Sequence, residues 1–381
     1  MARHIDPRAL TGSLIRKDLV FSMATESDEP DLRRLLRENR LGGRYQITLE
    51  REPNAFRADF ELAKYHAFII ARTRDTGDLV GLCEKVVWPC HVNGKLEMLP
   101  YIGALRVSEK YRNRISVLKG GFEALRLMAH CEGELPYALT SITSDNAVAR
   151  RILTANLPGL PAYHPVCDFS TFVLQAKRAT LDDAVVSATD GDLAEIAELL
   201  NGSNSAYQFS YFWTEASLRN LSGFGFRAEH FLLHRTNGKL RGCLAVWDQR
   251  ANRQTVMRAY PPLLSKLHPL ANLAAPLIGL PQLPRIGAAI DQAMLSHLAV
   301  EGDDRQVFQS LLSSGLCLAK ARGLDVASIG FAATRPLRKI LLEHARAIEY
   351  RTSLYLAHWP DGKDAVAALK PSTSHPEMAL L

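Results

Sequence analysis

Residues 101–122 read YIGALRVSEKYRNRISVLKGGF and combine three patterns in one short stretch. The first part is mostly apolar and ends at Val107, and the part after it is polar and basic. From Ile115 onward apolar residues recur at helical spacing, through Leu118 and Phe122. The stretch therefore predicts a strand, a tight basic turn and a helix.

The turn after Val107 predicts a site for an anion. A helix that begins directly after a turn points free backbone N–H groups and the positive end of its dipole at that turn, where a phosphate can bind. Arg112 and Arg114 add formal positive charge to the same place. An ordinary strand-to-helix turn with solvated arginines is the alternative interpretation.

The run from Arg106 to Arg114 resembles the central motif of the GNAT acyl-CoA N-acyltransferases, usually Arg/Gln-x-x-Gly-x-Gly/Ala after a strand. Arg112 falls on the Arg/Gln position, whereas Ile115 and Val117 stand where the family usually has glycine. The resemblance implies that this segment binds the pyrophosphate and pantetheine of coenzyme A, helped by an asparagine at the start of a later helix. The residues implied are Leu105, Arg106, Val107, Arg112, Asn113, Arg114, Ile115, Ser116, Val117 and Asn146.

The composition is that of a globular protein with room for two domains. The chain has 381 residues, 47% hydrophobic and 23% charged, and a modest net charge of +6. No basic run interleaved with aromatic residues marks a nucleic-acid groove, and the six cysteines lack the paired spacing of a zinc site or a disulfide framework. The cysteine spacing leads us to expect no metal. Because we find neither an apolar signal core nor a transmembrane run, we expect a cytoplasmic protein.

The first half follows the element order of a GNAT domain. A strand and a helix capped at Thr25 or Ser27 come first, and another helix is expected after Pro53. A three-strand meander then leads into the basic turn, and the helix after the turn runs to His130. The strands are expected at 19–23, 67–73, 79–87, 96–107, 139–143 and 169–174, with a further helix at 146–153.

The second half repeats this order. Residues 185–190 resemble 20–25, residues 297–305 resemble 104–112, and residues 326–331 resemble 137–143. The sequence therefore predicts a mixed α/β protein of two GNAT-like domains, each with a mostly antiparallel mixed central sheet flanked by helices. The predicted divisions are an N-terminal extension at 1–18, a cofactor-binding domain at 19–176, a linker at 177–183, a second domain at 184–360 and a tail at 361–381.

Two features distinguish the second copy. Its turn carries Asp303 and Asp304, whose charges would repel a pyrophosphate, so we expect that this copy does not bind the cofactor. It also contains a leucine- and proline-rich insertion near 261–293. We expect the insertion to pack against the first domain, with an acyl-chain or membrane-facing surface as the alternative.

Candidates for proton transfer come from the strands before the turn. Tyr101 falls where some GNAT relatives carry a glutamate base, and Glu84 and Glu97 on neighbouring strands are candidates that act through water. Each glutamate is otherwise a solvated strand residue.

The tyrosine that many relatives use as an acid is replaced by Leu153. Tyr163 and His164, expected in a loop after a proline-glycine turn, are candidates for that role, or else ordinary loop residues.

The favoured hypothesis is an N-acyltransferase. It would use acetyl-CoA or another acyl-CoA as cosubstrate and a small-molecule amine or a peptide-like acceptor. One alternative is a non-catalytic ligand- or partner-binding protein, favoured by the missing glycines and tyrosine. Another is an aminoacyl-tRNA-dependent transferase of the Fem type, which also has two GNAT-like domains. The oligomeric state and the identity of the amine stay open.

Overall fold

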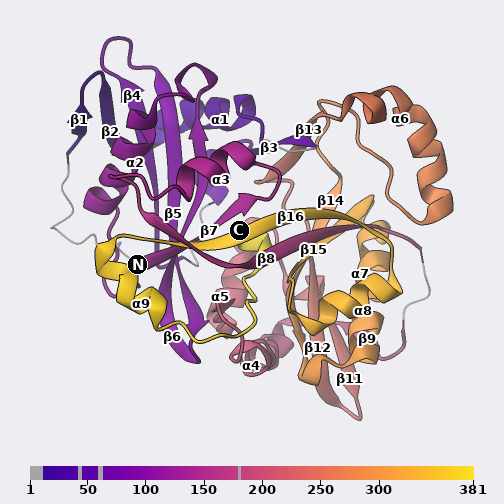
Figure 1. Ribbon diagram of the computed structural model, residues 1–381. Coiled ribbons are helices and arrows are strands. Elements are labelled where there is room, and N and C mark those ends of the chain that lie inside the picture. Colours follow the sequence, from indigo (N-terminus) through magenta and orange to yellow (C-terminus); the bar gives the residue numbers. More distant parts are fainter. Residues whose placement is uncertain (1–11, 42–44, 59–62, 179–181) are drawn as a thin grey trace.

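The computed structural model describes residues 12–41, 45–58, 63–178 and 182–381. In the first half, the predicted strand, turn and helix appear as β6, a short basic turn and α2 (Figure 1). The strands of this half are β1 Leu14–Arg16, β2 Leu19–Met23, β3 Gln46–Glu50, β4 Tyr65–Thr73, β5 Leu79–Val92, β6 Lys95–Val107, β7 Tyr137–Thr143 and β8 Ala162–Gln175. Its α-helices are α1 Glu29–Glu38, α2 Ile115–Met128 and α3 Ala147–Leu153.

The second half follows the same order, with a long helix, α7, after its own bulged strand, β14. Its strands are β9 Val185–Ser187, β10 Ser210–Tyr211, β11 Phe231–Thr236, β12 Lys239–Trp247, β13 Gln254–Ala259, β14 Gln292–Val300, β15 Val326–Ala332 and β16 Ala347–His358. Its α-helices are α4 Leu193–Asn204, α5 Glu215–Asn220, α6 Pro262–Ala274, α7 Arg305–Ala321, α8 Pro336–His344 and α9 Lys363–Ala367.

The two halves exchange their last strands. β16, from the second half, pairs antiparallel with β7 of the first half, while β8 pairs antiparallel with β15 of the second. β8 and β16 also pair with each other, from Ala162↔His358 to Leu174↔Ala347, and they cross the middle of the molecule side by side (Figure 1). The strand that the sequence places last in the first domain therefore lies against the second half, and all but two of the described strands join one continuous sheet.

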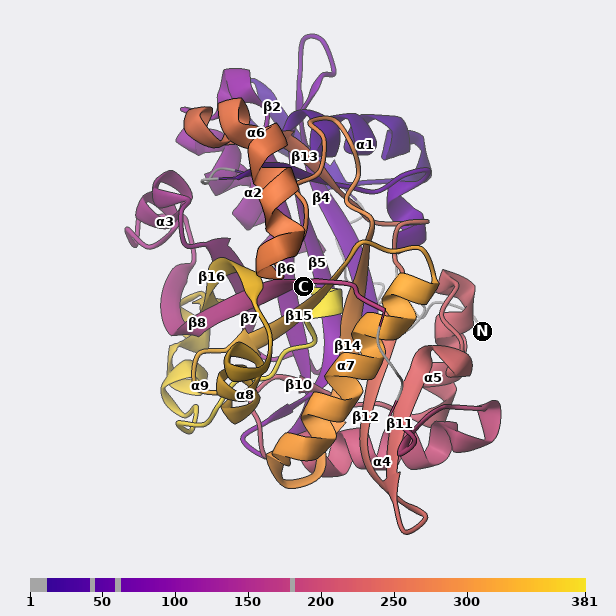
Figure 2. The ribbon, with the colours of Figure 1, turned by 90° about the vertical axis from the view of Figure 1, so that its right-hand side faces the viewer.

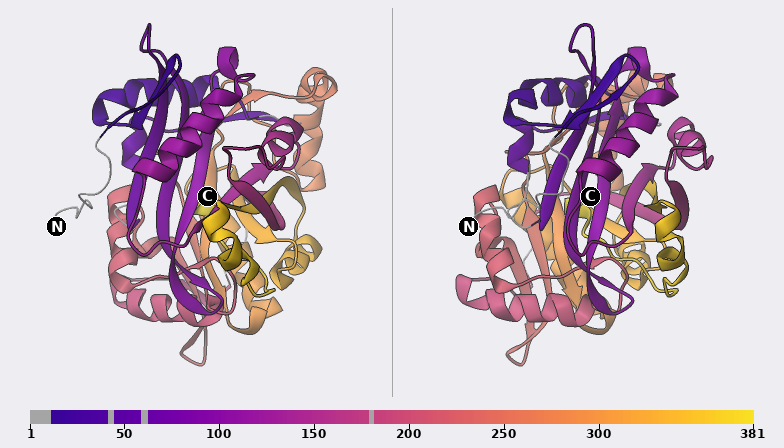
Figure 3. Two further views of the ribbon diagram at one scale, coloured as in Figure 1. Left: turned by 60° about the vertical axis from the view of Figure 1, so that its left-hand side comes forward. Right: turned by 90° about the vertical axis from the view of Figure 1, so that its left-hand side faces the viewer.

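The same packing recurs where each long helix meets its sheet. α2 lies along the first-half strands (Figure 3), and α7 lies along those of the second half (Figure 2). Val117 of α2 is buried against Gly81 of β5, and Val307 of α7 is buried against Gly242 of β12. In both places a glycine lets the helix approach the sheet closely, because a Cβ there would lie 3.0 Å from Val117 Cγ1 or 2.6 Å from Val307 Cγ1.

The structure corrects three sequence-based expectations outside the turn. The helix expected after Pro53 is a 3-10 turn at Ala55–Ala58, and residues 59–62 lie outside the described residues. β3 was not predicted, and it pairs with β13 in a separate two-stranded sheet. The insertion was expected to pack against the first domain, but its helix α6 has no buried residue, and burial is found after the helix, at Ala275 and Pro281. Within the described ranges, no helix is long and apolar enough to cross a membrane.

Candidate functional site

A cavity of about 460 Å³ opens where β6 and β7 separate. These parallel strands pair at Tyr101↔Leu139 and then diverge, so that both strands expose residues to the space between them. The cavity is also lined from the second half, by residues of β13, β16 and the segment after α6. A cleft between two diverging strands that another part of the chain closes on one side is a common form of ligand site.

A β-bulge turns β6 at the edge of this cavity. Leu82 pairs with Arg106 and Glu84 with Gly103, so two β6 residues oppose one residue of β5. One of these two, Ala104, has a φ of 49° and lines the cavity. Such a bulge interrupts the ladder and redirects backbone groups, which is a frequent arrangement next to active sites.

Tyr101 and Tyr163 both line the cavity. The Tyr101 hydroxyl lies 3.1 Å from Ser141 Oγ, on the neighbouring strand β7. Burial raises the pKa of Tyr101, and burial likewise raises the pKa of Tyr163, whose ring packs edge-on against Tyr355. Both phenols therefore stay protonated at neutral pH and are equipped to donate a hydrogen bond rather than to accept a proton.

Glu84 lines the cavity as one member of a buried cluster. Its carboxylate accepts hydrogen bonds from Arg51 Nη2 and lies 2.8 Å from His66 Nε2. Burial alone would raise the pKa of Glu84, but Arg51 and His66 outweigh burial and hold that pKa well below its usual range. A carboxylate in such a pair accepts a proton weakly, whether directly or through a water, which argues against Glu84 as a strong base.

Glu97 and His164 do not line the cavity. Glu97 faces Cys90 near the hairpin end of β6, four residues before Tyr101 and so about 13 Å away along the strand. The sequence placed Tyr163 and His164 in a loop, but both lie in β8. Because neighbouring strand residues point to opposite faces, Tyr163 is buried at the cavity while His164 is exposed.

Arg106 brings a positive charge into the cavity wall. Its Nη1 donates to the carbonyl of Leu105 (3.0 Å), its Nε is buried without a hydrogen-bond partner, and no ion pair with a carboxylate is found for it among the described residues. Burial, and then the nearby charge of Arg51, lower the pKa of Arg106 to about 10. The guanidinium is therefore charged at neutral pH and favours an anionic group beside it.

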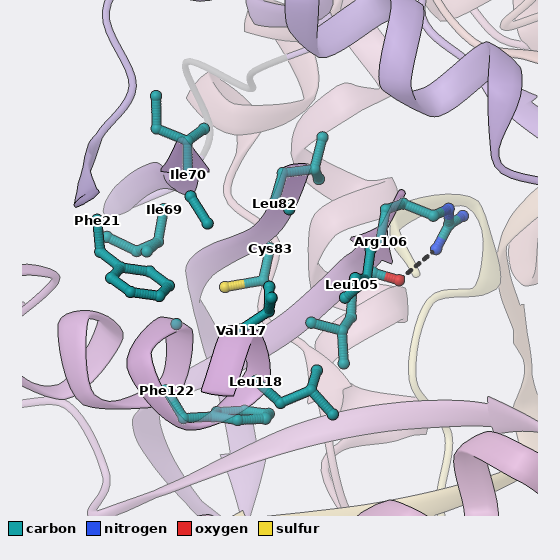
Figure 4. Close-up of a pocket in the computed structure, with 14 residues that line it drawn as sticks. Phe21, Ile69, Ile70, Leu82, Cys83, Leu105, Arg106, Val117, Leu118 and Phe122 are labelled. Carbon is teal, nitrogen blue, oxygen red and sulfur yellow. Dashed lines mark hydrogen bonds between the residues drawn. The ribbon is translucent and has the colours of Figure 1, made fainter. Parts of the chain in front are cut away.

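The crevice beneath the basic turn is narrow and apolar. It measures about 20 Å³ and lies between α2 and the ends of β4, β5 and β6, lined among others by Leu105, Val107 and Val117. Figure 4 shows Arg106 turning its guanidinium away from this crevice. Val117 is buried here, so its β-branched side chain points at the sheet instead of at the turn.

The turn itself is basic and open to solvent. α2 begins at Ile115, and its N-cap residue, Arg114, makes no side-chain capping bond. Arg114 instead pairs with Asp18 (2.7 Å), while Arg112 Nη2 donates to Asn39 Oδ1 at 3.2 Å. Asn113 is exposed and Ser116 is half-buried beside them. An uncapped helix start flanked by arginines fits a phosphate group.

Asn146 occupies a different position. Its side chain accepts a hydrogen bond from the backbone N–H of Ala149 (3.1 Å) and so caps α3. Asn146 and Ala149 also line the cavity, which therefore extends from the bulge of β6 to the start of α3.

In the second half, the chain's own carboxylates fill the corresponding places. Asp304 accepts from the backbone N–H groups of Gln306 (2.8 Å) and Val307 (3.0 Å) and caps α7. Asp303 pairs with the buried Arg335. At a helix start that is capped by a carboxylate, backbone N–H groups are already bonded and the negative charge repels a phosphate.

The bulge of β14 is also occupied. Its bulge residue His297, with a φ of 50°, donates its backbone N–H to Glu377 Oε2 at 2.8 Å. The same contact in the first half is absent among the described residues, because Ala104 faces the cavity. Sequence comparison of the copies did not identify Glu377, since it lies in the C-terminal tail that has no counterpart in the first half.

No acid cluster in the described ranges is arranged to hold a metal ion. The side-chain carboxylates that line the cavity are each paired: Glu50 with Arg258, Glu84 with Arg51, and Glu349 with Arg338 and Arg351.

No family model matches the sequence, and a search of curated proteins finds no match. Among solved structures, the N-myristoyltransferase of Saccharomyces cerevisiae with bound myristoyl-CoA is similar, with a TM-score of 0.59 at 14% identity over 93% of this chain and 85% of that one. A GCN5-related N-acetyltransferase from Sphaerobacter thermophilus is similar with a TM-score of 0.52 at 12% identity, over 90% of this chain and 96% of that one. The chain therefore has the mixed α/β fold of GNAT-type N-acyltransferases, and the expected fold class is confirmed.

Proposed function

We propose that the protein is an acyl-CoA-dependent N-acyltransferase whose first half binds the acyl-CoA. The observation that carries this proposal is the contrast between the halves. The bulge at Ala104 faces a cavity of about 460 Å³, whereas the bulge at His297 is bonded to Glu377. On this proposal Arg112, Arg114 and the first turn of α2 hold the phosphates, and the divergence of β6 and β7 admits the pantetheine arm.

The chain's own groups would then assist transfer to an amine in three ways. The cavity holds both reactants together and limits water, which supplies much of the rate in such reactions. The charge of Arg106 favours negative charge that develops near the bulge. The Tyr101 hydroxyl, linked to Ser141, orients a water that carries the amine's proton toward Glu84.

The acceptor is proposed to be an amine on a small molecule or a peptide-like chain. Residues of both halves line the cavity, which supports the proposal that the second half completes this acceptor site. An acetyl group, which we expected from the sequence, uses a small part of the space, so a larger acyl group or acceptor is compatible with the volume.

The release of free coenzyme A, a thiol, tests this proposal. The full chain is mixed with acetyl-CoA or longer acyl-CoAs and a panel of amines, and free coenzyme A is measured. Release that requires both an amine and the protein supports the proposal. The alternative, a ligand-binding protein, is favoured by the ion pairing of the side-chain carboxylates in the cavity, which weakens each of them as a base. It predicts saturable acyl-CoA binding without any amine-dependent release.

A further inference from the structure

The helix α6 is oriented opposite to a usual surface helix. Two of its polar side chains face the protein: His268 Nε2 lies 3.2 Å from the carbonyls of Leu283 and Pro284, and Asn272 forms hydrogen bonds with both the N–H (2.6 Å) and the carbonyl (2.9 Å) of Leu283. Helices on the surface of a globular protein normally turn their apolar face inward. Here the inward side carries these two hydrogen-bonded polar side chains beside the half-buried Leu264 and Ala271.

The apolar face of α6 points to solvent and continues beyond the helix. Leu263 is 70% exposed, Leu270 64%, Leu273 73% and Leu277 86%. Leu263, Leu267, Leu270 and Leu273 are three or four residues apart and so share one side of the helix. We call this surface the leucine face; its large exposed residues are Leu263, Leu267, Leu270, Leu273, Leu277 and Ile278. Figure 1 shows α6 standing out at the edge of the molecule.

The charge around the leucine face is positive. Residues 261–290 contain Lys266 and Arg285 but no aspartate or glutamate. Lys266 and Arg285 are exposed, and the structure places neither in an ion pair within the described residues. The exposed Arg346 also reaches this surface, since its Nη1 donates to the carbonyl of Ile278 (3.1 Å). The basic residues around the leucine face therefore complement a negatively charged partner.

We infer that the leucine face binds the surface of an anionic lipid bilayer. Leucine side chains at the boundary of the acyl chains and basic residues among the headgroups are the two attractions that hold an interfacial helix to a membrane. With 13 residues, α6 is too short to span a bilayer and would lie along it. Contact between two copies through this face is less favourable, because it would bring Lys266 and Arg285 of each copy together without a carboxylate on the face to pair with them.

The face is coupled to the cavity through the segment that anchors α6. Leu283 and Pro284, which accept the bonds from His268 and Asn272, also line the cavity. Binding to a bilayer would therefore place this edge of the cavity next to the membrane surface. The inference stands on the leucine face itself and holds whether or not the protein is an acyltransferase.

The test is sedimentation of the full chain with vesicles of phosphatidylcholine alone and of phosphatidylcholine with phosphatidylglycerol in equal parts. We expect binding to the anionic vesicles to be at least about tenfold stronger than to the neutral ones. Replacing Leu270, Leu273 and Leu277 together by serine should weaken binding at least about tenfold. Because these side chains are exposed, the change should leave folding intact. The matched control replaces three exposed leucines elsewhere by serine, at Leu96, Leu127 and Leu342. It should bind the anionic vesicles within about twofold of the unmodified protein.

A charge variant, Lys266→Glu with Arg285→Glu, separates the two attractions and should abolish the preference for anionic vesicles. The inference is overturned if the unmodified protein does not sediment with anionic vesicles, or if the serine variant binds as well as the control. It is also overturned if the protein forms a dimer that only the serine variant loses and shows no vesicle binding, since the face would then join two copies.

Discussion

The backbone N–H of His297 donates a hydrogen bond to the carboxylate of Glu377, 2.8 Å away, at the bulge of β14. The corresponding bulge in β6 exposes Ala104 to the cavity. One of two similar strands is therefore bonded to a carboxylate from the chain itself, while the other is open. This difference is the basis of our proposal that the first half holds the acyl-CoA site.

Glu377 should make stability depend on pH. Burial raises the pKa of Glu377 from 4.5 to about 7. Because the folded-state pKa is the higher one, the contribution of Glu377 is fully present below about pH 4.5 and is lost as the pH rises through about 7. Glu377→Gln keeps an acceptor for His297 but cannot ionise, so the variant should gain stability relative to the unmodified protein over this range, by up to about 3 kcal/mol.

Chemical denaturation of both proteins at pH 4.5 and pH 8 measures this change. A difference in unfolding free energy that is constant with pH would show that Glu377 is ionised to the same degree in the folded and unfolded states.

Tyr101→Phe should lower kcat about 10- to 100-fold, because it removes the hydroxyl that lies 3.1 Å from Ser141 and that would orient the relay water. Affinity for acyl-CoA should change little. Tyr163→Phe is the matched comparison, a buried phenol in the same cavity wall. If Tyr163→Phe causes the larger loss and Tyr101→Phe none, the hydroxyl that assists proton transfer lies on β8.

Arg106→Met should reduce kcat/KM by roughly one to two orders of magnitude, since it removes a charge that favours an anionic group in the cavity. Arg106→Lys keeps the charge but not the fork of donors, and should be less impaired. Measuring kcat and KM separately locates the anionic group. A lower kcat alone indicates negative charge that develops during the reaction, whereas a higher KM alone indicates an anionic group on the bound substrate. Equal activity in all three proteins would remove Arg106 from the site.

Replacing glycine by alanine should destabilise the protein more where α7 meets its sheet than where α2 does. Gly242→Ala places a Cβ 2.6 Å from Val307, 2.9 Å from Leu311 and 3.2 Å from a backbone carbonyl, and should destabilise the protein by about 1–3 kcal/mol. Gly81→Ala meets Val117 at 3.0 Å with its other neighbours at 3.5 Å, and should cost less. Thermal unfolding of the two variants decides this, and the opposite order would mean that α2 packs more tightly than α7.

The basic turn and its helix were predictable because their signals are local. Apolar spacing from Ile115 and the arginines before it specify a helix start without reference to distant residues. The partners of β8 were not predictable, since an apolar strand shows that it is buried but not which strand it pairs with. β3 was missed for a related reason: Gln46–Glu50 is short, and its partner β13 lies in the other half.

The candidate site shows the same limit. Alternation along β6 and β8 decides that Tyr101 and Tyr163 face the cavity while His164 does not, but sequence does not give the place where β6 and β7 diverge. The outward leucines of α6 contradict the packing expected from an apolar segment, because apolar spacing identifies a face and not what covers it.

Isothermal titration of acyl-CoA into the full chain and two variants tests whether the first half alone holds the acyl-CoA site. We expect one molecule bound per chain. Arg112→Ala with Arg114→Ala should weaken binding by about 1–3 kcal/mol, the range for charge-assisted contacts. Asp304→Ser, which removes a charge from the second turn while keeping a cap for α7, should leave affinity unchanged. Two molecules per chain, or binding that ignores the arginine pair and responds to Asp304→Ser, would contradict the assignment of the site to the first half.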